Sequence, residues 1–68
     1  MASVLASLRT KRSLTLEACA HRAKIPPTRL ERIENGAAHV YLNDLFGLAD
    51  AFRLRPSTLI KRIDEAVR

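Results

Sequence analysis

The sequence predicts a small all-α domain of five helices. Apolar residues recur every three to four positions along most of the 68 residues, and this is the spacing of one helix face. The three prolines stand between these apolar stretches, where helices are expected to end or begin. Only three aromatic residues are present, which disfavours an all-β fold, and the length allows one domain.

The first two helices follow from the apolar spacing and from one capping residue. The first is expected at about residues 2–12 and the second at about residues 16–23. Thr15 is suited to cap the second helix, because its hydroxyl can accept a hydrogen bond from a free N–H group of the first turn. The residues expected to face inward are Val4, Leu5, Leu8, Cys19, Ala20 and Ala23.

Prolines and a glycine delimit the third helix. The second helix must end near Ile25, because each of the two prolines that follow keeps the preceding residue out of the α region. Pro27 suits the first position of a new helix, which continues over residues 28–34. Gly36 is expected to end this helix in the left-handed conformation that glycine adopts without strain.

The last two helices follow a loop at residues 37–41. The fourth is expected at about residues 43–52, and the fifth begins at Pro56 and continues to the C-terminus. Gly47 lies inside the fourth helix, where a glycine weakens the helix and indicates close packing. The apolar stripes of the last three helices comprise Leu30, Ile33, Leu42, Leu45, Phe46, Ala49, Phe52, Leu59, Ile60, Ile63 and Val67.

The net charge of +5 lies entirely in the first half of the chain. Residues 1–32 carry seven basic and two acidic side chains, whereas residues 33–68 carry five of each. This uneven distribution favours a polyanionic partner. The alternative is a basic surface that serves only solubility.

The sequence offers little for catalysis, metal binding or membrane attachment. The single cysteine, Cys19, is expected to be a small core residue, and with His21 and His39 it lacks the spacing of metal ligands. No glycine-rich phosphate loop, nucleophile motif or acid–base pair is present. The apolar start is too short to span a bilayer and lacks a basic leader. We therefore expect a cytoplasmic, nucleoid-associated protein that is not an enzyme and needs no metal, cofactor, small-molecule ligand or membrane.

Two short helices joined by about four residues, in the basic half of an all-α chain, are typical of a helix-turn-helix motif, here at about residues 15–35. Residues 14–25 (LTLEACAHRAKI) and 30–36 (LERIENG) resemble the Cro and lambda-repressor type of bacterial and phage regulators, also called the XRE family. With the fourth and fifth helices the resemblance covers roughly residues 4–63. It implies a five-helix, lambda-repressor-like domain whose third helix lies in the major groove of DNA.

The resemblance also implies an ion pair between Arg9 and Glu34. Breaking a partly buried pair from one side costs about 3–5 kcal/mol. We therefore expect Arg9 to stabilise the fold, the alternative being a contact with DNA phosphate.

Three positions depart from the family pattern. Leu16 stands where the family usually has glutamine, and leucine cannot donate a hydrogen bond to phosphate or base. Lys24 replaces a glycine, at a cost of about 1 kcal/mol if the turn is left-handed. The prolines at 26 and 27 replace a capping serine at the start of the third helix. These departures support an alternative function, a protein–protein interaction module such as an antitoxin or adaptor that retains the fold with weak or no specific DNA binding.

Helical geometry predicts that Thr28, Arg29 and Arg32 share the exposed side of the third helix. Arginine can form two hydrogen bonds with guanine, and threonine can contact the methyl group of thymine. Arg32 is expected to read a base, with a phosphate contact or pairing with Glu31 as the alternative. Arg29 could contact base or phosphate, and Thr28 could equally be an ordinary first-turn residue. Phosphate contacts are expected from Lys11, Arg12, Thr15, Arg22, Lys24 and Asn35. His39 and Tyr41 are expected in a partly packed surface loop. The alternative, which the resemblance implies, is that this loop runs along the DNA backbone.

The chain is expected to act as a homodimer on double-stranded DNA. One domain of this size contacts too few base pairs for high specificity, whereas two copies can read an inverted repeat with half-sites about one helical turn apart. The dimerisation region is expected at about residues 54–68, with Ile60, Ile63 and Val67 facing the partner. The alternative is that these side chains cover the core of the monomer. The function that follows is a transcriptional regulator, a repressor that could also act on its own gene.

Overall fold

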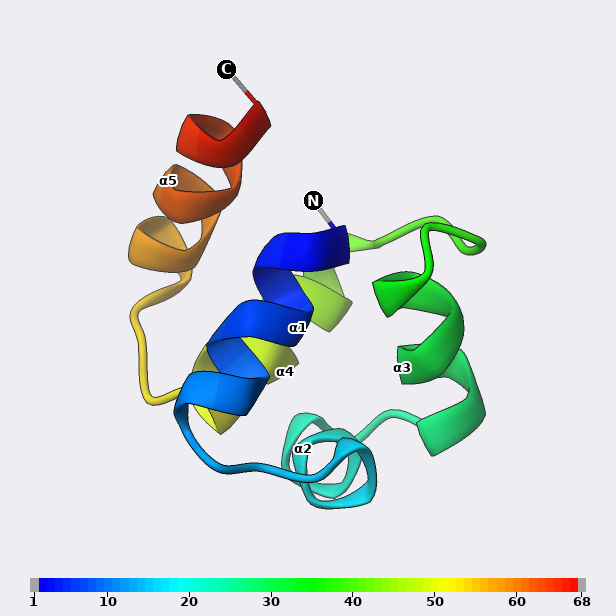
Figure 1. Ribbon diagram of the computed structural model, residues 1–68. Helices are drawn as coiled ribbons and strands as arrows, with labels where there is room; N and C mark the ends of the chain where they lie inside the picture. The colour runs from blue at the N-terminus through cyan, green and yellow to red at the C-terminus, as the bar shows by residue number, and fades with distance from the viewer. Residues whose placement is uncertain (1, 68) are drawn as a thin grey trace.

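The computed structural model describes the backbone of residues 2–67 and the side chains of residues 4–66. This part of the chain forms five helices, which confirms the predicted all-α class: α1 (Ala2–Lys11), α2 (Leu16–Ala23), α3 (Pro27–Glu34), α4 (Leu42–Ala51) and α5 (Pro56–Val67). Each begins within one residue of its predicted start. Figure 1 shows α3 and α5 on opposite sides of the molecule, with α1 and α4 between them and α2 below.

The core lies where the five helices meet. α4 packs against α2 and α5, while α1 packs against α3 and α5. The largest fully buried side chains are Phe52, Leu5, Leu30, Ile33, Leu48, Leu59 and Cys19. Every helix contributes to this set or to its small neighbours, so the short α3 is anchored through Leu30 and Ile33 although much of its surface is exposed.

The predicted stripe on α4 is only partly buried. Leu42 and Phe46 remain 58% and 47% exposed. Leu48, Ala51 and Phe52 set the inward face of this helix. Leu42 and Phe46 lie one turn apart on a different side of the helix, so including them in the core stripe was wrong.

Gly47 is needed for the contact between α4 and α2. A Cβ atom at this position would collide with the carbonyl oxygen of Ala23. The backbones of the two helices therefore approach more closely than any side chain would allow. The prediction of close packing at Gly47 is confirmed.

Each of the first four helices is followed by a residue in the left-handed region: Ser13 (φ 55°), Lys24 (φ 61°), Gly36 (φ 73°) and Arg53 (φ 57°). At each site, two backbone hydrogen bonds close the last turn, as in Ile25 N–H to the carbonyl oxygen of Ala20 at 3.0 Å. The predicted left-handed conformation of Gly36 is confirmed. Lys24 also adopts the left-handed conformation that was considered for it. The left-handed residues Ser13 and Arg53 were not predicted.

Candidate nucleic-acid interface

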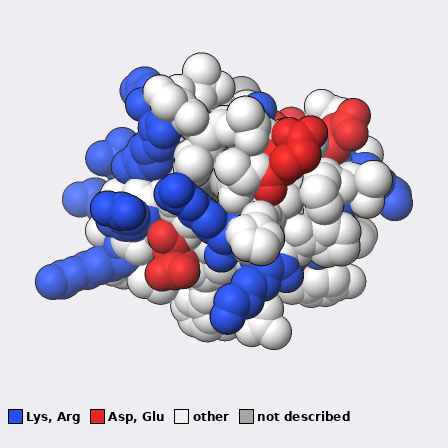
Figure 2. Space-filling view, turned by 90° about the horizontal axis from the view of Figure 1, so that it is seen from below, with Lys and Arg blue, Asp and Glu red and all other residues white. Residues whose placement is uncertain are grey.

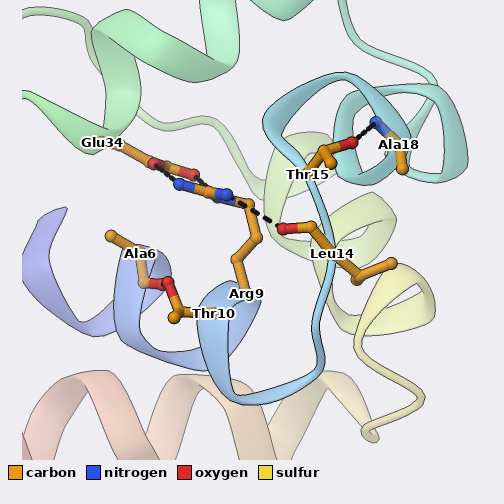
Figure 3. Close-up of polar contacts among 7 residues, drawn as sticks. All are labelled: Ala6, Arg9, Thr10, Leu14, Thr15, Ala18 and Glu34. Carbon is orange, nitrogen blue, oxygen red and sulfur yellow. Dashed lines mark hydrogen bonds and ion pairs between the residues drawn. The ribbon is translucent and has the colours of Figure 1, made fainter.

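α2, the turn at residues 24–26 and α3 form a helix-turn-helix arrangement. Thr15 caps α2, its Oγ1 atom accepting a hydrogen bond from the N–H group of Ala18 at 3.1 Å (Figure 3). Pro26 precedes α3 and supplies no side-chain cap. α2 packs against α3, and Leu30 and Ile33 anchor α3 in the core. One face of α3 is thereby held in the fold while the opposite face is presented to solvent.

An ion pair fixes the C-terminal end of α3 to α1. The Nε atom of Arg9 lies 2.9 Å from Oε2 of Glu34, and Nη2 lies 3.1 Å from Oε1 (Figure 3). Nη1 of Arg9 donates to the carbonyl oxygen of Leu14 at 3.0 Å. The hydrogen bond to Glu34 raises the pKa of Arg9 above its ordinary value, while desolvation acts in the opposite direction. All three guanidinium nitrogens are thus engaged within the fold.

A second ion pair joins the middle of α3 to the start of α4. Nη2 of Arg29 donates to Oδ2 of Asp44 at 2.5 Å and to the carbonyl oxygen of His39 at 3.1 Å. The same carboxylate oxygen accepts a hydrogen bond from the N–H group of Tyr41 at 2.9 Å. The guanidinium carbon lies 5.4 Å from the centre of the Tyr41 ring. Arg29 is therefore held against the α3–α4 loop.

Sequence reasoning missed Asp44, although it is a buried charged residue. Burial alone would raise the pKa of its carboxyl group, but the hydrogen bonds from Arg29 and from the Tyr41 N–H group bring that pKa below its ordinary value. The hydrogen bond to Asp44 also raises the pKa of Arg29. The available sequence signal was the position of an aspartate in the first turn of α4, where carboxylates cap helices.

Arg32 and Thr28 lie on the exposed face of α3. Arg32 contacts the carbonyl oxygen of Ala37 through Nη2 at 3.5 Å, the outer limit of a hydrogen bond. Hollows of about 370 and 300 Å³ adjoin this side chain. Arg29 and Arg32 line both, together with Gly36, Ala37, Ala38, His39 and Tyr41 in the larger and with Pro26, Thr28 and Ala38 in the smaller.

The predicted phosphate-contacting residues do not form one group. Thr15, Arg22, Lys24 and Asn35 are exposed on the motif. Arg12 is half-buried instead, because its Nε atom donates to the carbonyl oxygen of Phe52 at 2.8 Å and its guanidinium lies over the Phe52 ring. Lys11 lies in a hollow between α1 and α5.

The basic side chains therefore occupy more than one side of the molecule. Figure 2 shows Lys and Arg gathered on its left, where Figure 1 has the end of α1 and the α4–α5 connection. Arg12, Arg22 and Arg53 line a hollow of about 260 Å³ near the ends of α1, α2 and α4. Lys11 and Arg12 are thus not brought together with the exposed face of α3.

The fifth helix divides its apolar residues between the core and the surface. Leu59 is fully buried and Ile63 packs against the core, whereas Ile60 remains 42% exposed. The side chain of Val67 lies outside the described residues. Of the predicted dimer contacts, Ile60 is therefore the large apolar side chain that the structure shows exposed.

Three further features of the described residues concern metal binding, thiol chemistry and membrane crossing. No group of three His, Cys, Asp or Glu side chains among them could hold a metal ion. Cys19 is buried, and desolvation raises the pKa of its thiol, which disfavours the reactive thiolate. No helix in this part of the chain has the length and apolar character needed to cross a membrane.

Comparison with known families agrees with this geometry. A family model described as "Helix-turn-helix domain" matches residues 1–62. The matched region contains α2 and α3 completely and extends into α5. Comparisons with curated proteins and with solved structures gave no match.

Proposed function

This chain belongs to the helix-turn-helix family, and on that premise we propose that it is a sequence-specific, double-stranded DNA-binding regulator that represses transcription. The observation that carries this proposal is the exposed face of α3, where Arg32 and Thr28 lie about one turn apart. Leu30 and Ile33 anchor the opposite face in the core, and the Arg9–Glu34 pair fixes the end of the helix. A rigidly held helix with exposed hydrogen-bond donors suits the major groove.

Within this proposal, Arg32 reads a base. Its guanidinium is exposed and its hydrogen bond within the fold is long, so little is lost when it turns to the two acceptors of a guanine. Thr28 contacts a neighbouring base. Thr15, Arg22, Lys24 and Asn35 contact phosphates, helped by the free N–H groups at the start of α2.

The protein acts as a homodimer in this proposal. α3 is only eight residues long, so one copy reads a short sequence. Two copies related by a two-fold axis read both halves of an inverted repeat. The exposed Ile60 on α5 supports a contact between the two copies at this helix. When this dimer occupies an operator, it represses transcription by excluding the polymerase from the promoter. The repressed promoters include that of its own gene.

Selection from a random duplex library at near-physiological salt, with excess competitor DNA, tests this proposal. We expect a two-fold symmetric motif. Arg32→Ala should relax one position in each half-site, because a bidentate contact contributes about 1–3 kcal/mol of discrimination. The matched control is Arg55→Ala, which removes the same charge from the exposed α4–α5 connection and should leave the motif unchanged.

Folded protein that yields no motif would contradict the proposal. The chain would then be better explained as a protein–protein interaction module such as an antitoxin or adaptor. Capture of a specific partner protein on the immobilised chain would be the next measurement in that case.

A further inference from the structure

The Arg29–Asp44 pair lies directly beside the proposed base-reading residue. Arg29 and Arg32 line the same hollows on the exposed side of α3, yet only Arg29 pairs with a buried carboxylate. We propose that Asp44 is a positioning residue for DNA recognition, which holds Arg29 in one place and thereby lowers the affinity for DNA of unrelated sequence. This inference rests on the function proposed above.

The position of the Asp44 carboxylate is set by backbone as well as by charge. Its side chain is 9% exposed, and the N–H group of Tyr41 donates to the same oxygen atom that Arg29 contacts. Tyr41 immediately precedes α4, so this oxygen is fixed to the first turn of that helix. Arg29 is consequently fixed to α4 and not only to its own helix.

Two further contacts restrict the guanidinium of Arg29. Its Nη2 atom also donates to the carbonyl oxygen of His39, and its carbon lies 5.4 Å from the centre of the Tyr41 ring. Both contacts lie in the loop that follows α3. The side chain is thus held on three sides by groups from one short segment, residues 39–44.

This arrangement changes what Arg29 offers to DNA. A mobile arginine can reach any nearby phosphate, and such contacts strengthen binding to every sequence. The charge of the paired Arg29 is compensated by the Asp44 carboxylate and its position is restricted, so it favours only DNA whose groups fit that position. Asp44 therefore acts on the difference between specific and non-specific binding, through Arg29, without contacting DNA itself.

Asp44→Asn separates this role from the stability of α4. The amide oxygen of asparagine can still accept the hydrogen bond from the Tyr41 N–H group, while the charge that holds Arg29 is lost. Asp50→Asn is the matched control, since it removes one negative charge from an exposed position on the same helix. Thermal melting monitored by circular dichroism shows which variants are folded.

Dissociation constants are measured for two labelled duplexes of about 30 base pairs, enough for two half-sites. One carries the motif selected by the wild-type protein, and the other carries the same bases in scrambled order. The readout is the dissociation constant for the scrambled duplex divided by that for the motif. We expect Asp44→Asn to lower this ratio about fivefold to tenfold, mainly by tighter binding of the scrambled duplex. Asp50→Asn should tighten binding to both duplexes equally and leave the ratio unchanged.

A second variant keeps the inference testable if Asp44→Asn does not fold. Arg29→Lys retains the positive charge but cannot reproduce the planar contacts that hold it in place. It should therefore weaken binding to the motif without weakening binding to the scrambled duplex. A wild-type ratio in a folded Asp44→Asn or Arg29→Lys protein would overturn the inference, as would an equal change in Asp50→Asn. If the wild-type protein selects no motif, the proposed function fails first and this inference fails with it.

Discussion

At the scale of single residues, the burial of a carboxylate partner separates the arginines of this interface into two kinds. Arg9 and Arg29 pair with Glu34 and Asp44, whose side chains are each only 9% exposed. Arg32 has a long hydrogen bond to a backbone carbonyl instead. A buried carboxylate loses more when its partner leaves, so the first two arginines are held in one position by the fold. Arg32 is the one best placed to exchange its contact for a base.

Arg9→Ala should lower the free energy of unfolding by about 3 kcal/mol. This is the lower end of the range for a broken buried pair, because Arg9 itself is one-fifth exposed. Urea denaturation measures the loss. Arg55→Ala, at an exposed position, is the control and should leave stability nearly unchanged. Normal melting of Arg9→Ala would contradict the structural role of the pair.

Acid should destabilise the protein partly through Asp44. Its pKa is below the ordinary aspartate value in the folded protein, so the unfolded chain takes up this proton at a higher pH. The stability that Asp44 contributes is therefore fully present above the unfolded pKa of about 4, and is lost as the pH falls through the folded value. Urea denaturation at several pH values should show a smaller loss in Asp44→Asn than in wild type. An equal loss in both would contradict this assignment.

The two ion pairs also differ in how far the sequence could predict them. Arg9 and Glu34 were expected from the resemblance to a known family. Arg29 and Asp44 lie on different helices, and their contact depends on the path of the loop between them, which residue spacing does not determine. The contact of Arg12 with Phe52, 40 positions away, was missed for the same reason.

At the scale of the helices, three helix ends share one feature that their residue types do not indicate. Ser13, Lys24 and Arg53 occupy left-handed positions where glycine is the usual residue. The residue after each is apolar and packs against the core: Leu14, Ile25 and Leu54. This apolar contact offsets the strain of the preceding residue. Helix lengths and starts could be predicted from periodicity and prolines. The left-handed residues Ser13 and Arg53 could not, because within a single sequence only glycine signals this conformation.

Arg53→Gly should therefore stabilise the protein. Relief of the left-handed strain is worth about 1 kcal/mol or more, and the added flexibility of the unfolded chain offsets part of it. We expect a net gain of about 0.5 kcal/mol, or roughly 2–4 °C in Tm for a domain of this size. Arg62→Gly, which removes the same side chain from an exposed position inside α5, should lower Tm because glycine weakens a helix interior. Equal changes in the two variants would contradict this account of the helix end.

At the scale of the whole molecule, charge asymmetry along the chain is not the same as asymmetry in space. The basic half of the sequence contains both the end of α1 and most of α3, which Figure 1 shows on different sides. Lys11 and Arg12 therefore lie apart from Arg32, although all three belong to the basic half of the sequence. Net charge predicted the kind of partner, while the fold decides which cations can face one DNA duplex.

The oligomeric state is also a property of the whole molecule. A chain of 68 residues buries a modest fraction of its surface, and α5 is held to the rest by one face only, with Leu59 inside and Ile60 exposed. Ile60→Glu should leave Tm nearly unchanged, because the side chain is not in the core, but should convert a dimer into a monomer. Sedimentation equilibrium at tens of micromolar measures this, with Lys61→Glu as the exposed control on the same helix. A wild-type monomer at that concentration would contradict dimerisation through α5. The operator would then have to be read by two copies that meet only on DNA.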